Sequence, residues 1–265
     1  MNILSFDIGG TKIAYGIVDE NGHFIAPAKK FPTPQTAGEI RDKIKEVIDT
    51  SSFDGLAVAT AGVVYDNHLL SKPLNLPEGF EAIDFSSLTE KPVLVENDAN
   101  SAAWCEYKIG AAKGCDHAIV LAIGTGVGCG IICDNKLLKG KSGAAGECAF
   151  AISGKDFAQL ARQYNTSVDC FALYDLALKG DEAAQKVYEI WQNRLSEALI
   201  QLNDLFDTQK IVLAGSLAEI ADYELLQEKI NKHSFGEAPL ITKSSGLNFP
   251  ALAGAALLWY DEYAK

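Results

Sequence analysis

Two patterns of apolar and polar residues alternate along the chain. Short apolar runs that end in glycine, proline or asparagine are typical of buried strands, and apolar residues that recur every three or four positions are typical of amphipathic helices. Strands are expected from Ile3 and at 13–18, 24–31, 56–60, 93–96, 211–214 and 240–242, with a strand-turn-strand segment at 117–133. Helices are expected at 36–50, 99–111, 156–163, 167–178, 183–206, 217–230 and 252–260. Thr36 could cap the first of them, with Glu39 three residues on as a capping box, and the helix at 183–206 carries an apolar stripe that includes Trp191. This order predicts an α/β protein.

The first strand ends in an unusual group of residues, ILSFDIGGT at 3–11. Asp7 is a poor strand former, and the glycines at 9 and 10 allow the backbone to approach a ligand closely. A carboxylate beside backbone N–H groups and the Thr11 hydroxyl could hold a hydrated Mg²⁺ and phosphate oxygens. The simpler alternative is a hairpin turn that Asp7 caps.

A second copy of this segment favours the ligand-binding hypothesis. Residues 10, 11, 16 and 17 (Gly, Thr, Gly, Ile) recur 114 positions later at 124, 125, 130 and 131. Repetition at so long an offset predicts two similar domains. Asp7 corresponds to Leu121, so we expect the first turn to hold a metal and the second to offer backbone donors. Two such hairpins would together form a nucleotide site.

Composition narrows the classes of partner and compartment. The chain of 265 residues is 48% hydrophobic and carries a net charge of −12. This charge argues against nucleic acid or an anionic membrane as a partner. The overall negative field would also repel a nucleotide such as ATP, which would therefore depend on local donors and Mg²⁺. No apolar window is long enough for a membrane span, no signal peptide is recognisable, and the six cysteines show no paired spacing. We expect a cytoplasmic protein with reduced thiols.

These motifs, with Asn97-Asp98, AAGE at 144–147, VLAGS at 212–216 and LAGAALL at 252–258, resemble the ROK family of sugar kinases. The resemblance implies two actin-like (ribonuclease H-like) α/β domains with a central cleft that closes on the sugar. The implied domains are a small one at 1–108 and a larger one at 109–250, with the closing helix at 251–265 packing back on the first. A homodimer is implied by the resemblance alone.

Asp98 is the candidate general base, because a carboxylate within hydrogen-bond reach can orient a sugar hydroxyl and accept its proton. Asn97 would bind a ring hydroxyl. The structural alternative is that Asp98 simply caps a helix, with Asn97 as a turn residue.

The resemblance also assigns the nucleotide site. Asp7 would orient Mg²⁺ through water, and Gly9, Gly10, Thr11 and Lys12 would meet the transferred phosphate, although Lys12 could equally be a solvated strand residue. On the other side of the triphosphate we expect Gly124, Thr125, Gly126 and Gly128, with the adenine at Gly215 and Ser216. No Walker A motif is present, and the glycines at 124–128 do not open a helix as a dinucleotide fingerprint must.

The sugar site shows a departure from the family. Glu147 matches the family's sugar-binding Glu, although it could be an ordinary surface residue; Gly62 and Asn75 are further candidates. In most of the family a His follows two residues after this Glu and a cysteine-rich zinc loop comes next. Here Cys148-Ala149-Phe150 follows instead, so we predict no zinc site.

The resulting hypothesis is an ATP-dependent kinase that acts on the 6-hydroxyl of a hexose or N-acylhexosamine, with N-acetylmannosamine or glucose favoured. The missing His motivates the alternative of a catalytically weak or inactive protein that binds sugar and nucleotide. A transcriptional regulator is a third class, which we discount because the chain starts directly at its first strand, without the winged helix such members carry.

Overall fold

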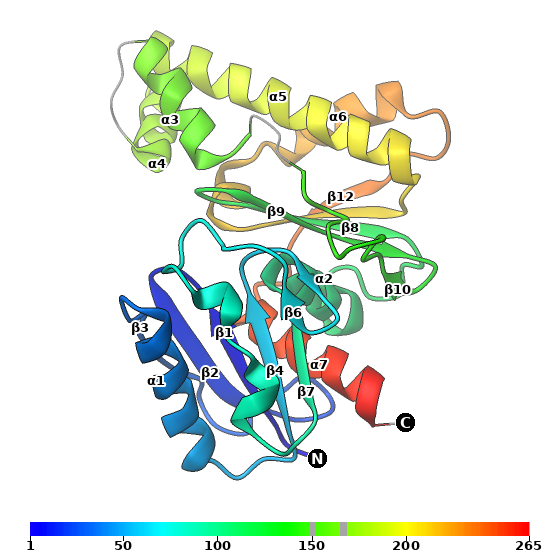
Figure 1. Ribbon diagram of the computed structural model, residues 1–265. Coiled ribbons are helices and arrows are strands. Elements are labelled where there is room, and N and C mark those ends of the chain that lie inside the picture. Colours follow the sequence, from blue (N-terminus) through cyan, green and yellow to red (C-terminus); the bar gives the residue numbers. More distant parts are fainter. Residues whose placement is uncertain (149–151, 165–168, 265) are drawn as a thin grey trace. The chain divides into compact units, whose positions relative to one another are not determined.

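The computed structural model describes residues 1–148, 152–164 and 169–264. The chain divides into two compact units. Unit 1 comprises 1–113, 137–146 and 245–265, and unit 2 comprises 114–136 and 147–244. Figure 1 shows a sheet flanked by helices in each unit.

The described residues of unit 1 form a five-stranded sheet in the order β3-β2-β1-β4-β7. Its strands are β1 (Ile3–Ile8), β2 (Lys12–Val18), β3 (Lys29–Pro32), β4 (Gly55–Thr60) and β7 (Val93–Asn97). β1 and β2 form an antiparallel hairpin, whereas β4 lies parallel to both β1 and β7. The carboxyl ends of β1, β4 and β7 therefore meet at one edge of the sheet. Asp7 lies near the end of β1, and Asp98 directly follows β7.

Unit 2 repeats this topology in its described residues, in the order β10-β9-β8-β11-β12. The strands are β8 (Ala118–Ile123), β9 (Val127–Cys133), β10 (Lys136–Leu137), β11 (Lys210–Ala214) and β12 (Leu240–Lys243). Again a first antiparallel hairpin is followed by parallel strands. The internal repeat predicted from the two Gly-Thr segments is thus confirmed.

Opposite faces of the unit 1 sheet are covered by different helices. Helix α1 (Ala37–Asp49) starts at Thr36, which forms the predicted capping box with Glu39. Its buried Ile40 and Ile44 pack with Phe6, whose side chain points to the same face. Successive strand residues alternate in direction, so Ser5 points to the other face, where its hydroxyl donates to the Leu252 carbonyl of α7 at 2.7 Å.

Helices α2 (Asp98–Ile109) and α7 (Pro250–Tyr263) pack closely within unit 1. A Cβ added at Gly254 of α7 would lie 1.7 Å from the Ser101 carbonyl oxygen of α2. Only glycine allows the two backbones to approach this closely.

Unit 2 carries helices beside its sheet (Figure 1). They are α3 (Gly154–Gln163), α4 (Cys170–Leu178), α5 (Glu182–Phe206) and α6 (Tyr223–His233). Trp191, in the predicted apolar stripe of α5, stacks on Phe157 of α3 with ring centroids 5.0 Å apart. Its indole N–H donates to the Ile152 carbonyl at 2.9 Å, so the large side chain is buried without an unpaired donor.

Several predicted boundaries were wrong. The helix expected at 217–230 is two elements, a 3₁₀ helix at Ser216–Ile220 and then α6, because Asp222 caps a new helix by accepting from the Leu225 N–H. The third strand is shorter than the expected 24–31 and lies at Lys29–Pro32. The start of the helix expected at 167–178 falls on residues outside the described ranges.

A short hairpin, β5 (Val64–Tyr65) and β6 (His68–Leu69), was not predicted from the sequence. Asp66 and Asn67 form its turn with positive φ angles of 50° and 63°. The Asn67 side chain accepts from the Val95 N–H and donates to the Val93 carbonyl, so it covers the edge of β7.

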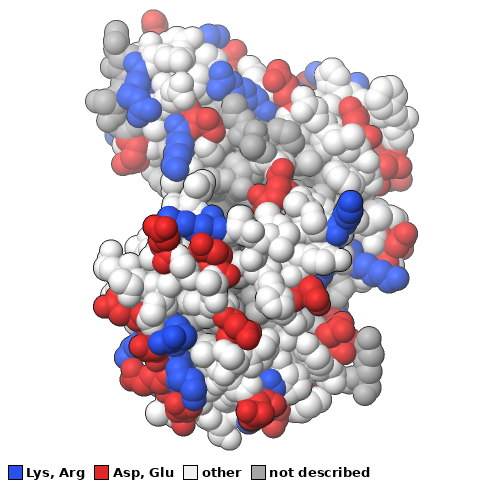
Figure 2. Space-filling view, viewed as in Figure 1, with Lys and Arg blue, Asp and Glu red and all other residues white. Residues whose placement is uncertain are grey.

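Basic and acidic side chains are interspersed on the face drawn in Figure 2, and the described residues there form no continuous basic surface. None of the helices in the described ranges combines the length and apolar character that a membrane span requires.

Candidate active site

Two half-buried carboxylates, Asp7 and Asp98, lie together at the carboxyl edge of the unit 1 sheet. Burial, together with the negative charge of Asp98, raises the pKa of Asp7 to about 6, although Lys12 acts in the opposite direction. Burial also raises the pKa of Asp98, while hydrogen bonds from backbone N–H groups oppose this. Each carboxylate therefore occupies a site that disfavours negative charge unless a cation or a proton is present.

Asn97, and not Asp98, is the N-cap residue of α2. Its Oδ1 accepts from the Asn100 N–H at 3.0 Å, and Asp98 is the first helical residue. The structural alternative in which Asp98 caps the helix was therefore wrong. The Asp98 carboxylate accepts from the neighbouring Ala99 N–H at 2.8 Å, and the helix N-terminus favours its charge.

Two glycines bring the predicted sugar-site residues of unit 1 together. The Asn97 Nδ2 donates to the Gly62 carbonyl at 3.0 Å, and Gly62 has a φ of +100° that favours glycine. A Cβ added at Gly10 would lie 2.4 Å from the Asn75 carbonyl oxygen. The turn between β1 and β2 thus contacts the loop of Asn75, while the loop of Gly62 is joined to Asn97.

The turn between β1 and β2 is tightly held. The Gly9 N–H donates to the Lys12 carbonyl at 3.1 Å, and the Thr33 hydroxyl donates to the Gly9 carbonyl at 2.6 Å. Gly10, Thr11 and Lys12 are exposed at the tip. Both the metal-binding and the plain hairpin interpretation of this turn are compatible with that geometry, and the burial of Asp7 beside Asp98 favours the first.

Unit 2 contains a cavity of about 540 Å³ at the second Gly-Thr turn. Gly124, Thr125 and Ser216, all predicted from the sequence, line it. The Gly154 N–H donates to the Gly124 carbonyl at 2.6 Å, and a Cβ at Gly215 would lie 2.5 Å from the Ile123 carbonyl oxygen. Glycines therefore let three chain segments converge on this cavity.

The other nucleotide-site residues predicted in unit 2 are near the cavity but are not among the residues that line it. Gly126 closes the turn, its carbonyl accepting from the Gly124 N–H at 2.9 Å. Gly128 is in β9, opposite Ala122 of β8. Neither of these two glycines, nor Gly215, is among the cavity's lining residues.

Sequence reasoning missed further residues of this cavity, among them Lys155 in the first turn of α3 and Phe171 in α4. Ser153 and Asp156 form a capping box that places Lys155 at the start of α3. Asp169 caps α4 by accepting from the Phe171 and Ala172 N–H groups. The capping signals in the sequence could have predicted both helix starts, but not that they share a cavity.

Glu147 is exposed at the start of the second part of unit 2. The next residue, Cys148, is tied to β9 by a hydrogen bond from the Cys129 thiol, which lowers the pKa of Cys148. Ala149 stands at the position of the His that most of the family carries. Ala149 and Phe150 lie outside the described ranges. Among described residues, no group of three or more His, Cys, Asp and Glu side chains could hold a metal ion; the absence of a zinc site stays a prediction.

Comparison with known proteins adds independent information. The sequence model of the ROK family matches residues 3–150 and 148–262. An N-acetylmannosamine kinase of Escherichia coli (strain 55989 / EAEC) is 30% identical over 257 residues, covering 86% of this chain and 87% of that protein. A glucokinase of Streptomyces coelicolor is 41% identical over 155 residues, which cover 54% of this chain and 47% of that protein, so the match spans about half the length of this curated relative.

A solved structure extends the likeness over nearly the whole chain. The crystal structure of a ROK family glucokinase from Streptomyces griseus, in complex with glucose and AMPPNP, has a TM-score of 0.77 and 27% sequence identity. The match covers 97% of this chain and 99% of that protein.

Proposed function

This chain belongs to the ROK family, and from that premise we propose that it is an ATP-dependent sugar kinase. The reaction is transfer of the γ-phosphoryl group of ATP to the 6-hydroxyl of a hexose or N-acylhexosamine. The observation that carries the proposal is the half-buried pair of carboxylates, Asp7 and Asp98, at the carboxyl edge of a sheet whose hairpin presents a Gly-Gly-Thr turn.

Asp98 is proposed to orient the attacking hydroxyl and to accept its proton. Its raised pKa brings the carboxylate closer to the operating pH, where a general base is most effective. Asn97 can support the sugar at the same time. One N–H of its amide is used by Gly62 and one lone pair by Asn100, which leaves a donor and an acceptor for a ring hydroxyl.

The residues at Asp7 fit a hydrated Mg²⁺. The pKa of about 6 shows that the ionised carboxylate is poorly compensated within the protein, as expected for a group that a cation completes. When bound with ATP, Mg²⁺ neutralises charge on the β- and γ-phosphate oxygens. Lys12 is exposed at the same turn, and its side chain is long enough to reach a phosphate.

The adenine and ribose are proposed to enter the unit 2 cavity. Its wall combines backbone at Gly124 and Thr125 with an aromatic ring, Phe171, which is 45% exposed and can stack on a base. Lys155 supplies positive charge at the same wall. The AMPPNP complex of the Streptomyces griseus relative supports a nucleotide site in this family.

For the substrate we propose N-acetylmannosamine or glucose, the sugars for which the two compared relatives are named. Glu147 would accept sugar hydroxyls. The test is ADP release by the purified protein with ATP and Mg²⁺ over a panel of glucose, N-acetylmannosamine, N-acetylglucosamine, mannose, fructose and allose. Release that depends on one sugar and survives a zinc chelator in excess Mg²⁺ would establish a zinc-free kinase and its substrate.

The second candidate is a protein that binds sugar and nucleotide but catalyses weakly or not at all. The replacement of the family's His-containing segment by Cys148-Ala149-Phe150 favours it. In this case calorimetry would detect nucleotide binding while no sugar in the panel stimulates ADP release.

A further inference from the structure

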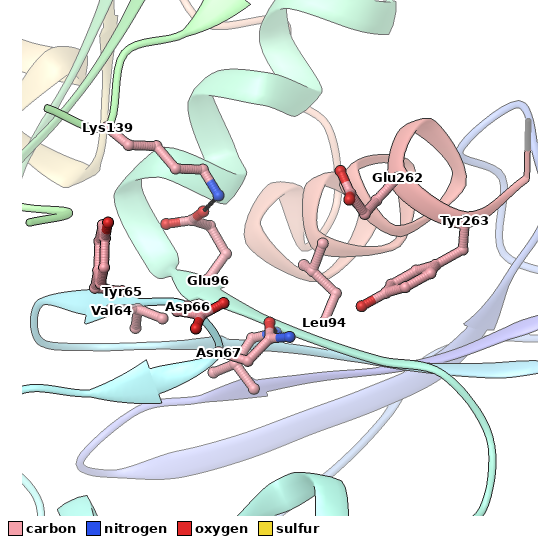
Figure 3. A pocket seen from close by; sticks show the side chains of 10 residues that line it. Val64, Tyr65, Asp66, Asn67, Leu94, Glu96, Lys139, Glu262 and Tyr263 are labelled. Atoms are coloured by element: carbon pink, nitrogen blue, oxygen red, sulfur yellow. Dashed lines mark hydrogen bonds and ion pairs between the residues drawn. The ribbon is translucent and has the colours of Figure 1, made fainter. Parts of the chain in front are cut away.

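Glu96 lies in β7, directly before Asn97 and Asp98. Its side chain is only 1% exposed, which is unusual for a carboxylate. Its Oε1 accepts from the Asn97 N–H at 2.9 Å and from the Asn100 Nδ2 at 3.1 Å. Its Oε2 forms an ion pair with the Lys139 Nζ at 2.6 Å, drawn as a dashed line in Figure 3. A buried carboxylate requires such partners, because burial without them is costly.

Lys139 comes from a distant part of the chain. Residues 137–146, here called the connecting segment, leave unit 2 after Lys136 and belong to unit 1, and the chain re-enters unit 2 at Glu147. The connecting segment has little regular structure of its own; the Ala145 N–H donates to the Lys139 carbonyl at 3.2 Å. Its position therefore depends on what it contacts in unit 1.

A second contact anchors the connecting segment beyond Lys139. Gly143 has a φ of +78°, and a Cβ there would lie 2.0 Å from the Val64 carbonyl oxygen. Val64 begins the β5–β6 hairpin, whose Asn67 is bonded to Val95 of β7. Both anchors thus lead back to β7, the strand that ends in Asn97.

Both residues of the ion pair line a cavity of about 520 Å³ (Figure 3). Among the described residues that line it, Lys139 is the base, and the acids are Asp66, Glu96 and Glu262. Glu96 holds the lysine because its carboxylate is buried and fixed by two further donors, whereas an exposed carboxylate remains hydrated.

We propose that Glu96 and Lys139 are positioning residues that join the Asn97–Asp98 turn to the connecting segment and so set the place from which Glu147 binds the sugar. Glu147 follows Gly146, the last residue of the connecting segment. Because consecutive Cα atoms are about 3.8 Å apart, anchoring this segment at Lys139 and Gly143 limits where Glu147 can lie. The proposal rests on the proposed function and extends it to two residues that touch neither sugar nor nucleotide.

The test compares Glu96→Gln/Lys139→Met with Lys139→Arg and with the wild type. Met keeps the length of the lysine, and Gln keeps an oxygen for the Asn97 N–H, so no charge is left buried and unpaired. We expect the double variant to raise the KM for the sugar about tenfold, equivalent to about 1.4 kcal/mol. We expect kcat and the KM for ATP of the double variant to stay within about twofold of the wild type. Lys139→Arg, which keeps the positive charge, should retain the wild-type sugar KM. Lys186→Met, which breaks the exposed ion pair with Glu189, is the control.

A sugar KM within twofold of the wild type in the folded double variant would overturn the proposal. So would a parallel loss of kcat, sugar affinity and ATP affinity, which indicates general damage. Hydrogen exchange of 137–147 provides a readout that does not need activity, with faster exchange expected in the double variant. If the wild type shows no sugar-dependent turnover, the proposed function fails, and unchanged exchange separately refutes the positioning role.

Discussion

Replacing Asp7 with Asn should stabilise the ligand-free protein while it removes the carboxylate that we propose to bind Mg²⁺. Asp7 has a pKa of about 6 in the folded protein against an ordinary value of 3.8. For a carboxylate with a raised pKa, the ionised form is less favourable in the folded chain, so stability is lost as pH rises from the unfolded to the folded pKa. The difference corresponds to about 3 kcal/mol at pH 7.5 and falls to about 0.5 kcal/mol at pH 4.

Urea unfolding of the wild type and Asp7→Asn at pH 7.5 and pH 4 measures this difference. We expect the variant to have the larger free energy of unfolding at pH 7.5, and the two proteins to converge at pH 4. Mg²⁺ with ATP should stabilise the wild type more than the variant. Asp42→Asn, at an exposed ion pair on α1, is the matched control and should leave the free energy unchanged. A variant that is less stable than the wild type at pH 7.5 would refute the reasoning.

Three further predictions follow from single residues. Asp98→Asn should fold normally and lower kcat by roughly 10²–10⁴-fold, and full activity of the variant would exclude Asp98 as the base. Because the pKa of Asp98 is raised and the base must be ionised, wild-type kcat/KM should rise with pH through that pKa. Phe171→Ala should raise the KM for ATP several-fold, from a stacking contribution of about 0.5–1.5 kcal/mol, without changing the sugar KM; an unchanged KM for ATP would place the adenine elsewhere. Gly254→Ala should lower the free energy of unfolding by roughly 1–3 kcal/mol in urea titrations, because its Cβ would overlap the Ser101 carbonyl, and wild-type stability would contradict the close approach of α2 and α7.

Local signals in the sequence predicted much of the secondary structure. The capping box of Thr36 and Glu39 placed the start of α1 correctly, because a cap depends on residues within one turn. The same kind of signal was overlooked at Asp222, where a cap begins α6, and at the Asp66-Asn67 turn. These misses were failures to weigh a local signal, and the information was present in the chain.

The repeat of the Gly-Thr hairpins predicted the paired topology of the two sheets, and the Asn97-Asp98 motif predicted where the carboxylates would lie. Both inferences rest on order along the chain: parallel strands of one sheet present their carboxyl ends at the same edge. The N-cap assignment was wrong, because Asn and Asp are both good caps and the choice depends on which side chain reaches the third N–H of the helix.

What the sequence by itself determined is thus the periodic elements, their caps and the repeated Gly-Thr turns, all of which depend on neighbours in the chain. Only the tertiary structure decided the raised pKa of Asp7, the meeting of Lys155 and Phe171 with Thr125, and the ion pair of Glu96 with Lys139. Burial and electrostatic interaction depend on distance in space. Residues separated by tens of positions acquire a shared environment only when the chain folds, so their chemistry is a property of the packing and not of the local pattern.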